Sequence, residues 1–332
     1  LYRKMTIIES TNTPLYGSST DNATITFLCG ESEERLDFFK FAKIIVPVVF
    51  GVITVTGIAG NSITAVVILS NKGIKSTTDI LILNLAVADI IFIVCCIPIA
   101  IDVAMLDASG NTQWPFIDEL CRISGYIISA CSYISVYTLV LISLDRYLAL
   151  VHPIRAFSIR NKRNCYIILT VFWSIILLGN TPMLFESLFC PGLKNRKKSS
   201  MRVLHICLFV FGFVLPIIMM CVLYGHILKL FLTRNIPGMN NQRSLVHLQS
   251  KQRVTKMVIT VVMVFIICKL PFHIVSLYVN FDNCFENYPV ILTLRVVLML
   301  MTYANSCINP ILYSFYSKTF RKRCRDLFSC NK

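Results

Sequence analysis

Charged residues are scarce in this chain of 332 residues: they make up 15% of it, whereas 55% is hydrophobic and the mean hydropathy is +0.69. Soluble globular proteins carry about 25% charged residues, so the composition excludes an ordinary soluble protein. The one sizeable polar connection between apolar segments, about residues 233–252, is too short for an enzymatic domain. We therefore expect an all-α integral membrane protein that is not an enzyme and holds no metal or cofactor.

Acidic residues are especially few, with 17 Asp and Glu against 32 Lys and Arg. The connections after the first, third and fifth apolar segments, together with the C-terminus, carry 19 basic residues and three acids, whereas the opposite side carries 12 and 13. By the positive-inside rule, the basic side is cytoplasmic and the N-terminus is extracellular. Because topology explains the excess of basic residues, we expect no nucleic-acid partner.

No sequence repeat relates the two halves of the chain. Transporters built from inverted repeats would be expected to show one weakly, and a transporter or channel also needs a polar path across the membrane. The charged residues within the apolar segments are too few for such a path, so a seven-helix transporter is a remote alternative. No cleavable signal sequence is evident, and we expect insertion to rely on the first span.

Seven apolar segments are long enough to cross a bilayer. The third has 22 consecutive uncharged residues between Arg122 and Asp145, which as a helix span about 33 Å. The others cover about residues 44–71, 80–101, 164–185, 203–232, 257–281 and 296–317. We expect a seven-helix bundle over residues 41–317, an extracellular tail over residues 1–40 and a cytoplasmic amphipathic helix within residues 318–332.

The two ends of the chain differ in composition. Residues 1–40 are polar, and we expect them to be largely disordered until a partner binds; Asn22 begins a glycosylation acceptor motif. Residues 318–332 place apolar side chains on one helical face and basic ones on the other, as in a helix lying on an anionic inner leaflet. Cys324 and Cys330 are candidate acylation sites there.

Asp89 is an ionisable residue in the middle of the second segment, where a charge is costly. Polar residues at a similar depth on other segments predict a polar cluster around it that could hold a cation. These residues are Asn61, Ser135, Asn305, Ser306 and Asn309. The alternative is a buried, hydrogen-bonded carboxyl group with only a packing role.

Arg146, between Asp145 and Tyr147, marks the inner end of the third segment. On its own it could be an interfacial arginine, but its place in the third of seven spans favours a functional role. Pro216, inside the fifth segment, predicts a freed backbone carbonyl and a kink, as do prolines in the sixth and seventh. Kinked helices can pivot, which suits a conformational switch.

Most of the 14 cysteines lie within apolar segments, where they act as small hydrophobic residues. Cys121 and Cys190 lie on the outer side, and we expect a disulfide between them because the exterior is oxidising. Cys29 and Cys284 are candidates for a second disulfide that ties the tail to the last outer loop.

Aromatic residues alternate with acids in the outer connections, a pattern that suits a peptide with basic and apolar groups. An interfacial aromatic belt with solvated loops is the alternative for many of these residues. The candidate ligand residues are Asp102, Ile128, Glu186, Phe272, His273, Asp282, Arg295 and Met299.

The chain resembles the rhodopsin-like family of G-protein-coupled receptors over nearly its whole length. The resemblance rests on Gly60-Asn61, Leu85-Ala86-Val87-Ala88-Asp89, Trp114-Pro115-Phe116, Cys121 with Cys190, Asp145-Arg146-Tyr147, Trp173, Pro216 with Tyr224, Phe265 with Cys268 and Pro271, Asn309-Pro310 with Tyr313, and Phe320. Within the family, SVYTLVLISLDRYLALVHPI and YANSCINPILYSF are most similar to the allatostatin-A and galanin group of neuropeptide receptors.

The resemblance implies that Arg146, Tyr224 and Tyr313 serve a G-protein-coupling switch. It also implies that Asp89 and its polar neighbours line a sodium-type pocket. Two departures limit the comparison: Lys269 stands where the family usually has a tryptophan, and Lys251 stands where many relatives have an acid, so we expect no ion pair from Arg146 to that position.

Lys269 should face the bundle interior about a turn above Asp89, because it follows Phe265 by one helical turn. A lysine stem reaches about 6 Å. We expect its ammonium to pair with Asp89, or to reach Ser135 or Asn305, in the place that a sodium ion holds in relatives. The alternatives are a neutral amine or one that binds an acidic group of the ligand.

We therefore interpret the chain as a plasma-membrane receptor for an extracellular neuropeptide, with the lipid bilayer and a heterotrimeric G protein as further partners. An amine receptor would want an acid at Ile128, and a retinal pigment would want a lysine at Tyr303. The alternatives are a constitutively active or orphan receptor, or one for another peptide or small ligand.

Overall fold

The computed structural model describes residues 32–70, 76–105, 117–184, 198–233, 242–281, 289–316 and 318–328. Its helices are α2 (Ser32–Ser70), α3 (Thr77–Met105), α4 (Ile117–Val151), α5 (Pro153–Ile159), α6 (Lys162–Gly179), α7 (Lys198–Phe209), α8 (Leu215–Thr233), α9 (Gln242–Phe281), α10 (Pro289–Tyr316) and α11 (Lys318–Phe328). A 3-10 turn, η1 (Thr181–Leu184), follows α6, and a π-helical turn, η2 (Val210–Val214), joins α7 to α8. No β-strand occurs within these ranges.

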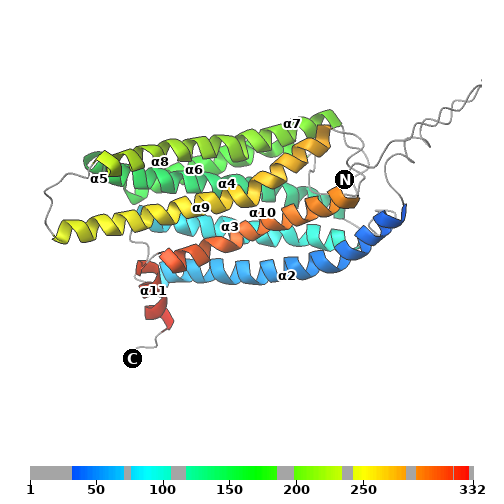
Figure 1. Ribbon diagram of the computed structural model, residues 1–332, viewed down its shortest axis with the longest axis horizontal. Coiled ribbons are helices and arrows are strands. Elements are labelled where there is room, and N and C mark those ends of the chain that lie inside the picture. Colours follow the sequence, from blue (N-terminus) through cyan, green and yellow to red (C-terminus); the bar gives the residue numbers. More distant parts are fainter. Residues whose placement is uncertain are drawn as a thin grey trace, which may run out of the picture.

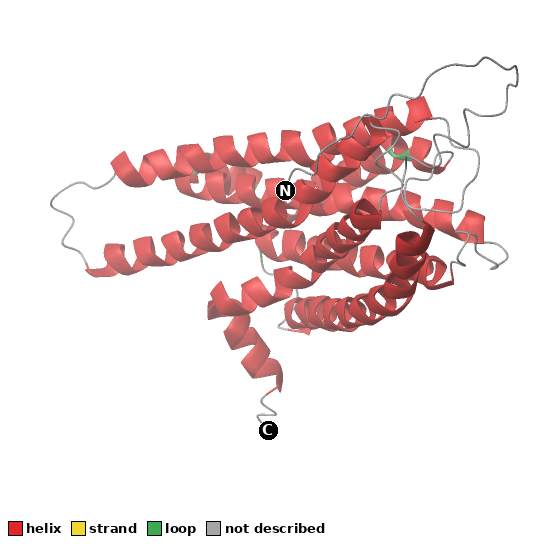
Figure 2. Cartoon of the chain, turned by 45° about the vertical axis from the view of Figure 1, so that its right-hand side comes forward, coloured by secondary structure: helices red, strands yellow, loops and turns green. Residues whose placement is uncertain are grey.

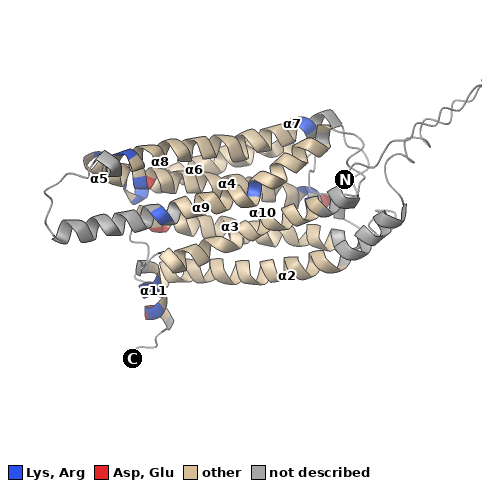
Figure 3. Cartoon of the chain, in the orientation of Figure 1, with Lys and Arg blue, Asp and Glu red and all other residues tan. Residues whose placement is uncertain are grey.

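Seven stretches of helix are long and apolar enough to cross a membrane, which confirms the predicted number of spans. They are Ile44–Ser70, Thr77–Ile101, Arg122–Val151, Lys162–Gly179, Arg202–Leu230, Ile259–Val279 and Leu294–Tyr316. They run side by side as a bundle, and α11 turns across its end (Figures 1 and 2). Among the described residues, Lys, Arg, Asp and Glu lie mostly toward the two ends of the bundle (Figure 3).

Three element boundaries differ from the sequence prediction. Helix α2 begins at Ser32, inside the segment that we expected to be an irregular tail. Helix α6 ends at Gly179, because Asn180 caps it and Pro182 follows in the 3-10 turn, so the fourth helix is shorter than expected. Helix α9 begins at Gln242, which gives helical structure to much of the predicted inner loop.

Close packing between α2 and its neighbours depends on two glycines, Gly57 and Gly60. A Cβ atom at Gly57 would clash with Ile93 and would lie 2.7 Å from the Cys307 sulfur. At Gly60 it would lie 3.2 Å from two side-chain atoms of Pro310. The absence of these Cβ atoms therefore lets α2 approach α3 and α10, as small residues do in membrane bundles.

The π turn shows where Pro216 leaves a carbonyl without an intrahelical donor. The N–H of Leu215 donates to the Val210 carbonyl, five residues back. Pro216 has no N–H, so the Phe211 carbonyl has no donor four or five residues ahead. The Tyr137 hydroxyl on α4 donates to that carbonyl at 3.0 Å. Residues on α4 thus complete the backbone hydrogen bonding of the fifth span, which a membrane interior requires.

Helix α11 is anchored to the end of the bundle by an ion pair and by packing. The Arg323 guanidinium lies 3.0 Å from the Asp79 carboxylate at the start of α3. Phe320 is buried beside Tyr313, with ring centroids 6.3 Å apart. The apolar face of this helix therefore packs on the bundle, in agreement with the predicted amphipathic pattern.

Candidate functional site

A polar cluster surrounds Asp89, which is 1% exposed in the middle of α3. Ser135 on α4 donates to one carboxylate oxygen at 3.1 Å, and the Asn309 side chain on α10 donates to the other at 2.8 Å. Asn61 donates to the Ser306 carbonyl at 3.0 Å, which extends the cluster to α2. Asn305 is also buried, on α10. The structure therefore brings Asp89 together with Ser135 and Asn309, as the sequence predicted.

Lys269 is buried in α9, but the predicted ion pair with Asp89 is wrong. The Lys269 ammonium donates to the Ser132 hydroxyl on α4 at 2.8 Å and lies 5.7 Å from the centre of the Phe92 ring. The ion pairs found among the described residues involve Asp79 and Asp145, and none joins Lys269 to Asp89. Ser132 and the aromatic ring take the ammonium instead, while Asp89 is held by Ser135 and Asn309.

The two charges are therefore held by successive turns of one helix. Ser132 and Ser135 are three residues apart on α4, which corresponds to a rise of about 4.5 Å. Each charge has a hydroxyl partner, and the ammonium also has an aromatic face, an arrangement that lowers the cost of burying it.

A second polar cluster lies near the C-terminal end of α4, around Asp145. The Arg160 guanidinium donates to both of its carboxylate oxygens, at 2.7 and 2.9 Å, and the Thr77 hydroxyl donates at 2.8 Å. The Thr78 hydroxyl also donates to Asp145, at 3.0 Å. Asp145 therefore ties α4 to the start of α3 and to the connection before α6.

Arg146 is directed at the start of α3. Its guanidinium donates to the Thr78 hydroxyl at 2.7 Å, whereas its distance to the Asp145 carboxylate is 4.0 Å. The guanidinium is thus hydrogen-bonded to a neutral hydroxyl, while the neighbouring carboxylate is engaged by Arg160. This geometry leaves Arg146 able to exchange partners without breaking a strong ion pair.

Three tyrosines near this end have separate environments. The Tyr224 hydroxyl on α8 lies 3.0 Å from the Ser143 hydroxyl, and the Tyr147 hydroxyl lies 3.1 Å from a ring nitrogen of His152. The Tyr313 hydroxyl is buried and has no hydrogen-bond partner within the described residues. The structure thus holds Tyr224 and Tyr147 on local partners and leaves a buried donor on α10.

The seven spans, with the polar clusters at their centre and at one end, match a known family. The sequence model of the family described as "7 transmembrane receptor (rhodopsin family)" matches residues 60–313. The chain belongs to this family. Its relatives are receptors, so the protein is a receptor and not an enzyme.

Named relatives narrow the likeness to neuropeptide receptors. The receptor is 34% identical to "Allatostatin-A receptor" of Bombyx mori, over 96% of this chain and 86% of that one. It is 35% identical to "Galanin receptor 2b" of Danio rerio, over 87% and 76% of the two chains. It is 32% identical to "Galanin receptor type 1" of Homo sapiens, over 86% and 81%.

The candidate ligand residues of the receptor are described only in part. Ile128 is 1% exposed and belongs to an apolar cluster with Tyr303, against which Met299 packs. Phe272 and His273 are adjacent on α9, and Arg295 is half-buried on α10. The structure thus brings Ile128 and Met299 together. Glu186 and Asp282 lie outside the described residues, and Asp102 is described only as part of α3.

Several other predicted positions lie outside the described residues. These are Asn22, Cys29, Cys190, Cys284 and Cys330. Cys121 is described only as part of α4. Cys324 lies on α11, where it packs in part against the core. The predicted disulfides, the glycosylation and the acylation therefore stay predictions.

An aromatic stack links α7 and η2 of the receptor to α9. Phe213 is stacked with Phe265, with ring centroids 5.9 Å apart, and lies 5.3 Å from the His273 ring. Phe209 lies 5.9 Å from Phe213 and 5.8 Å from His273. His273 therefore sits in a packed aromatic cluster that connects the fifth and sixth spans.

Sequence reasoning missed the residues that hold the charges of the receptor in place. Thr77, Thr78 and Arg160 bind the Asp145–Arg146 pair, and Ser132 binds Lys269. Two signals were visible in the sequence: Thr77 and Thr78 form a polar pair at the start of the second apolar segment, and Arg160 is a basic residue just before the fourth. Ser132, like Ser135, is a polar residue within the third apolar segment, so the sequence marked it equally as a possible partner.

Proposed function

We propose that the receptor binds an extracellular neuropeptide of the allatostatin-A or galanin kind and passes the signal to a cytoplasmic heterotrimeric G protein. The named relatives support the ligand class, since they are similar to this chain over most of its length. The segregation of basic residues supports an extracellular N-terminus and a cytoplasmic C-terminus in the plasma membrane.

The observation that carries the proposal is the partner set at the inner end of α4. Arg146 is held by Thr78, and Asp145 is held by Arg160 and Thr77. We propose that G-protein coupling releases Arg146 from Thr78 and that Tyr224 and Tyr313 stabilise the open form. The buried Tyr313 hydroxyl has no hydrogen-bond partner among the residues that the structure describes, and Tyr224 is held by one hydrogen bond, so both can form new bonds.

The peptide then acts by shifting a population. A ligand that converts a mixture with about 1% open receptor into one with about 99% must bind the open form about 10⁴-fold more tightly. The interior candidates Ile128, Phe272 and Met299 are apolar, and His273 packs against aromatic rings. We propose that they receive an apolar part of the peptide, while Asp102, Glu186 and Asp282 attract its basic groups and Arg295 an acidic one.

Covalent features complete the proposal. An extracellular disulfide between Cys121 and Cys190 would fix the outer end of α4 to the connection between η1 and α7, and one between Cys29 and Cys284 would fix the tail. Glycosylation at Asn22 requires the same extracellular orientation. Acyl chains on Cys324 or Cys330 would hold α11 at the inner leaflet, where its basic face meets anionic lipid.

The proposal is tested by expressing the receptor in cells and applying amidated allatostatin-A-type and galanin-type peptides. We expect a calcium or cyclic-AMP response to one class, saturable with dose and absent from untransfected cells. Signalling before peptide addition measures constitutive activity. A receptor at the cell surface that responds to neither class would contradict the proposed ligand.

A further inference from the structure

A serine lies between two arginines in and just after the short helix α5. Ser158 is exposed, Arg155 precedes it by three residues, and Arg160 follows it by two. Ala156 is the buried residue of this helix, and Phe157 is 93% exposed. A helix of seven residues is too short to be stable in water on its own, and this one has little buried surface. The Ser158 hydroxyl is therefore accessible to an enzyme that binds its substrate as an extended segment.

The Arg160 guanidinium has one occupied edge and one open edge. Its Nε and Nη2 atoms donate to the two carboxylate oxygens of Asp145, at 2.7 and 2.9 Å. Its Nη1 atom donates to no residue that the structure describes, and the side chain is 26% exposed. A guanidinium carries five N–H donors in a planar fork. A second anion can therefore bind at the open edge while Asp145 keeps the first.

The start of α6 adds positive charge beside this open edge. Lys162 and Arg163 are exposed in its first turn, which contains no acid. The Asn161 side chain donates to the Ser158 carbonyl at 3.3 Å, so Ser158 lies beside this helix terminus. The N-terminal end of a helix carries a partial positive charge, and its own first turn supplies no negative group to balance it here. An anion on Ser158 would supply that balance.

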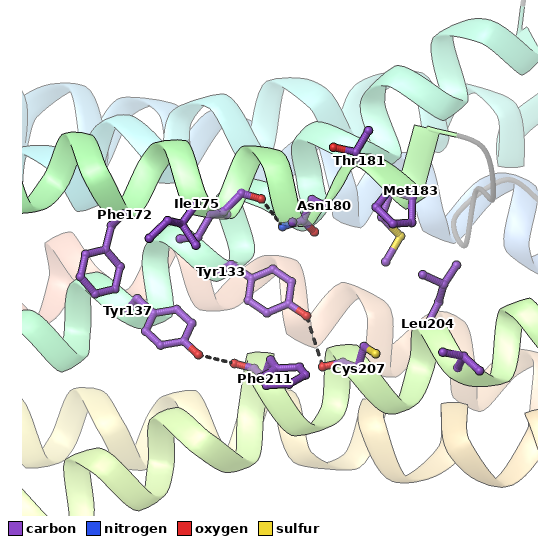
Figure 4. A pocket seen from close by; sticks show the side chains of 14 residues that line it. Tyr133, Tyr137, Phe172, Ile175, Asn180, Thr181, Met183, Leu204, Cys207 and Phe211 are labelled. Carbon is purple, nitrogen blue, oxygen red and sulfur yellow. Dashed lines mark hydrogen bonds between the residues drawn. The ribbon is translucent and has the colours of Figure 1, made fainter.

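The N-terminal end of α6 depends on these polar contacts because the helix is not packed on all sides. Helix α6 packs on α3 and α4, whereas an apolar cavity of about 1070 Å³ lies between it and α7. Phe172 and Ile175 of α6 lie on one side of this cavity and Phe211 on the other (Figure 4). The Asp145–Arg160 pair, just before α6, is thus a contact through which a charge on the connection acts on the bundle.

We propose that Ser158 is a phosphorylation site, and that its phosphate binds the open edge of Arg160 and holds the receptor in its closed form. The inference rests on the proposed cytoplasmic position of this end and on the proposed G-protein coupling. A phosphate brings a charge of about −1.5 to −2 and three acceptor oxygens. Opposite an arginine it forms about one to three charge-assisted hydrogen bonds, which order the segment that carries it.

The backbone brings the two side chains within reach of each other. Cα atoms two residues apart lie at most about 7 Å from each other, a distance that an arginine side chain and a phosphoserine together can bridge. In a continuous helix, side chains two residues apart point away from each other. Arg160 has left the helical conformation, with φ −80° and ψ 58°, so this restriction does not apply to it.

The modification uses a kinase and ATP. The Ser158 Oγ atom attacks the γ-phosphorus of ATP and forms a P–O bond, while the bond from that phosphorus to the bridging oxygen breaks and ADP leaves. The hydroxyl proton passes to a base of the kinase. Kinases select substrates in part by charge pattern. Arginines three residues before and two residues after the serine suit a kinase with an acidic substrate groove, such as protein kinase C.

The first test asks whether the site is used. Full-length receptor in phosphatidylcholine nanodiscs is incubated with the catalytic domain of protein kinase C and ATP, and its tryptic peptides are analysed by mass spectrometry. We expect about one phosphate per receptor on the peptide of residues 156–160, and none there in Ser158→Ala. Arg155→Gln should slow the reaction. Phosphate on other residues but none on Ser158 would overturn the proposal.

The second test asks what the phosphate does. Phosphoserine inserted at position 158 during synthesis gives fully modified receptor without a kinase. We expect its melting temperature to rise by about 2–4 °C and its basal stimulation of nucleotide exchange on a G protein to fall about three- to tenfold. Phosphatase should reverse both effects. An unchanged or lower melting temperature would overturn the proposal.

The melting temperature is measured without G protein, so it separates this proposal from the proposed coupling. A receptor that shows the rise in melting temperature but drives no nucleotide exchange in either state would contradict the coupling and support the phosphate contact. Normal exchange by the unmodified receptor with equal exchange by the phosphorylated one would overturn the control of the closed form by the phosphate.

Two arginine variants locate the contact. The phosphoserine should give no rise in melting temperature in Arg160→Gln and the full rise in Arg163→Gln, since Arg163 is an exposed arginine three residues further along the chain. Equal rises in the two variants would overturn the assignment to Arg160. If Arg160→Gln does not fold, Arg160→Lys replaces it. A lysine keeps the charge but has no second edge for the phosphate, so the rise should again be lost.

Discussion

The two charged regions of the bundle differ in whether opposite charges pair directly. At the end of the bundle that we propose to be cytoplasmic, called the inner end below, Asp145 and Arg160 pair directly, at 2.7 Å. At the centre, Asp89 and Lys269 stay apart, each bonded to a different serine of α4. Direct pairing of the inner carboxylate leaves Arg146 on a neutral hydroxyl that is easily exchanged. The central charges are instead both bonded to α4. We therefore propose that the central region stabilises the bundle and that the inner end changes partners when the receptor is activated.

The largest expected effect comes from removing the charge of Asp145. Asp145→Asn should lower the stability of the closed form by about 1.5–3 kcal/mol, the range for hydrogen bonds to a charged group, because Arg160 loses its carboxylate partner. The change should appear as a lower melting temperature and as higher signalling without peptide. Thermal unfolding and a basal reporter assay measure the two effects.

The matched control for this prediction is Arg163→Gln. Arg163 is exposed at the start of α6, three residues after Arg160, and carries the same charge, but it has no part in the Asp145 cluster. Arg160→Gln should reproduce the effect of Asp145→Asn, and Arg163→Gln should have little effect. Equal behaviour of the two arginine variants would show that the inner ion pair does not hold the closed form.

The second prediction concerns the partner of Lys269. Ser132→Ala removes the hydroxyl that accepts a hydrogen bond from the buried ammonium and should destabilise the receptor by about 1–3 kcal/mol. Lys269→Met should be neutral or stabilising, because it replaces a buried charge with an apolar chain of similar length. Melting temperatures of purified receptor in nanodiscs test both changes.

The combination of these two variants sharpens the comparison. In the Lys269→Met background, Ser132→Ala should cost much less, because no ammonium is left without a partner. Ser135→Ala should destabilise the receptor equally in both backgrounds, since Ser135 serves Asp89. If this double-mutant cycle couples Ser135, and not Ser132, to Lys269, then Lys269 contacts the Asp89 cluster directly, and the account is contradicted.

A smaller effect is expected for sodium. Because an ammonium lies close to the Asp89 cluster, it opposes binding of a second cation there, and agonist affinity should change by less than about twofold when sodium replaces a large organic cation. Lys269→Trp should introduce sodium sensitivity. Competition binding in the two salts gives the result, and a several-fold sodium effect on the unmodified receptor would contradict the account.

Much of the bundle could be predicted from the sequence because its physical causes are local. Uninterrupted apolar runs of membrane length predicted the seven spans, and the cost of a buried carboxylate predicted polar partners for Asp89, of which Ser135 and Asn309 are present. The amphipathic pattern predicted α11. Each of these inferences depends on composition and spacing along one segment.

Other features depend on how separate helices are placed. Ser132 and Ser135 lie one helical turn apart, so the reach of a lysine stem could not decide between them. Thr77 and Thr78 meet Asp145 across nearly 70 residues of chain, at 68 and 67 residues. The cavity between α6 and α7 arises because α6 packs on α3 and α4, whereas α7 packs on η2 and α9. The end of α6 at Gly179 depends on the side chain of Asn180, which the apolar pattern around it obscured.

The central claim is that peptide binding drives G-protein coupling through the inner end of α4. The most direct measurement is nucleotide exchange on a purified heterotrimeric G protein by receptor in nanodiscs, with and without peptide, for the unmodified chain and for Arg146→Ala. We expect the peptide to stimulate exchange only with the unmodified receptor, while peptide affinity, measured without G protein, stays within about twofold because Arg146 lies far from the ligand end. Stimulated exchange of equal rate by Arg146→Ala would contradict the account.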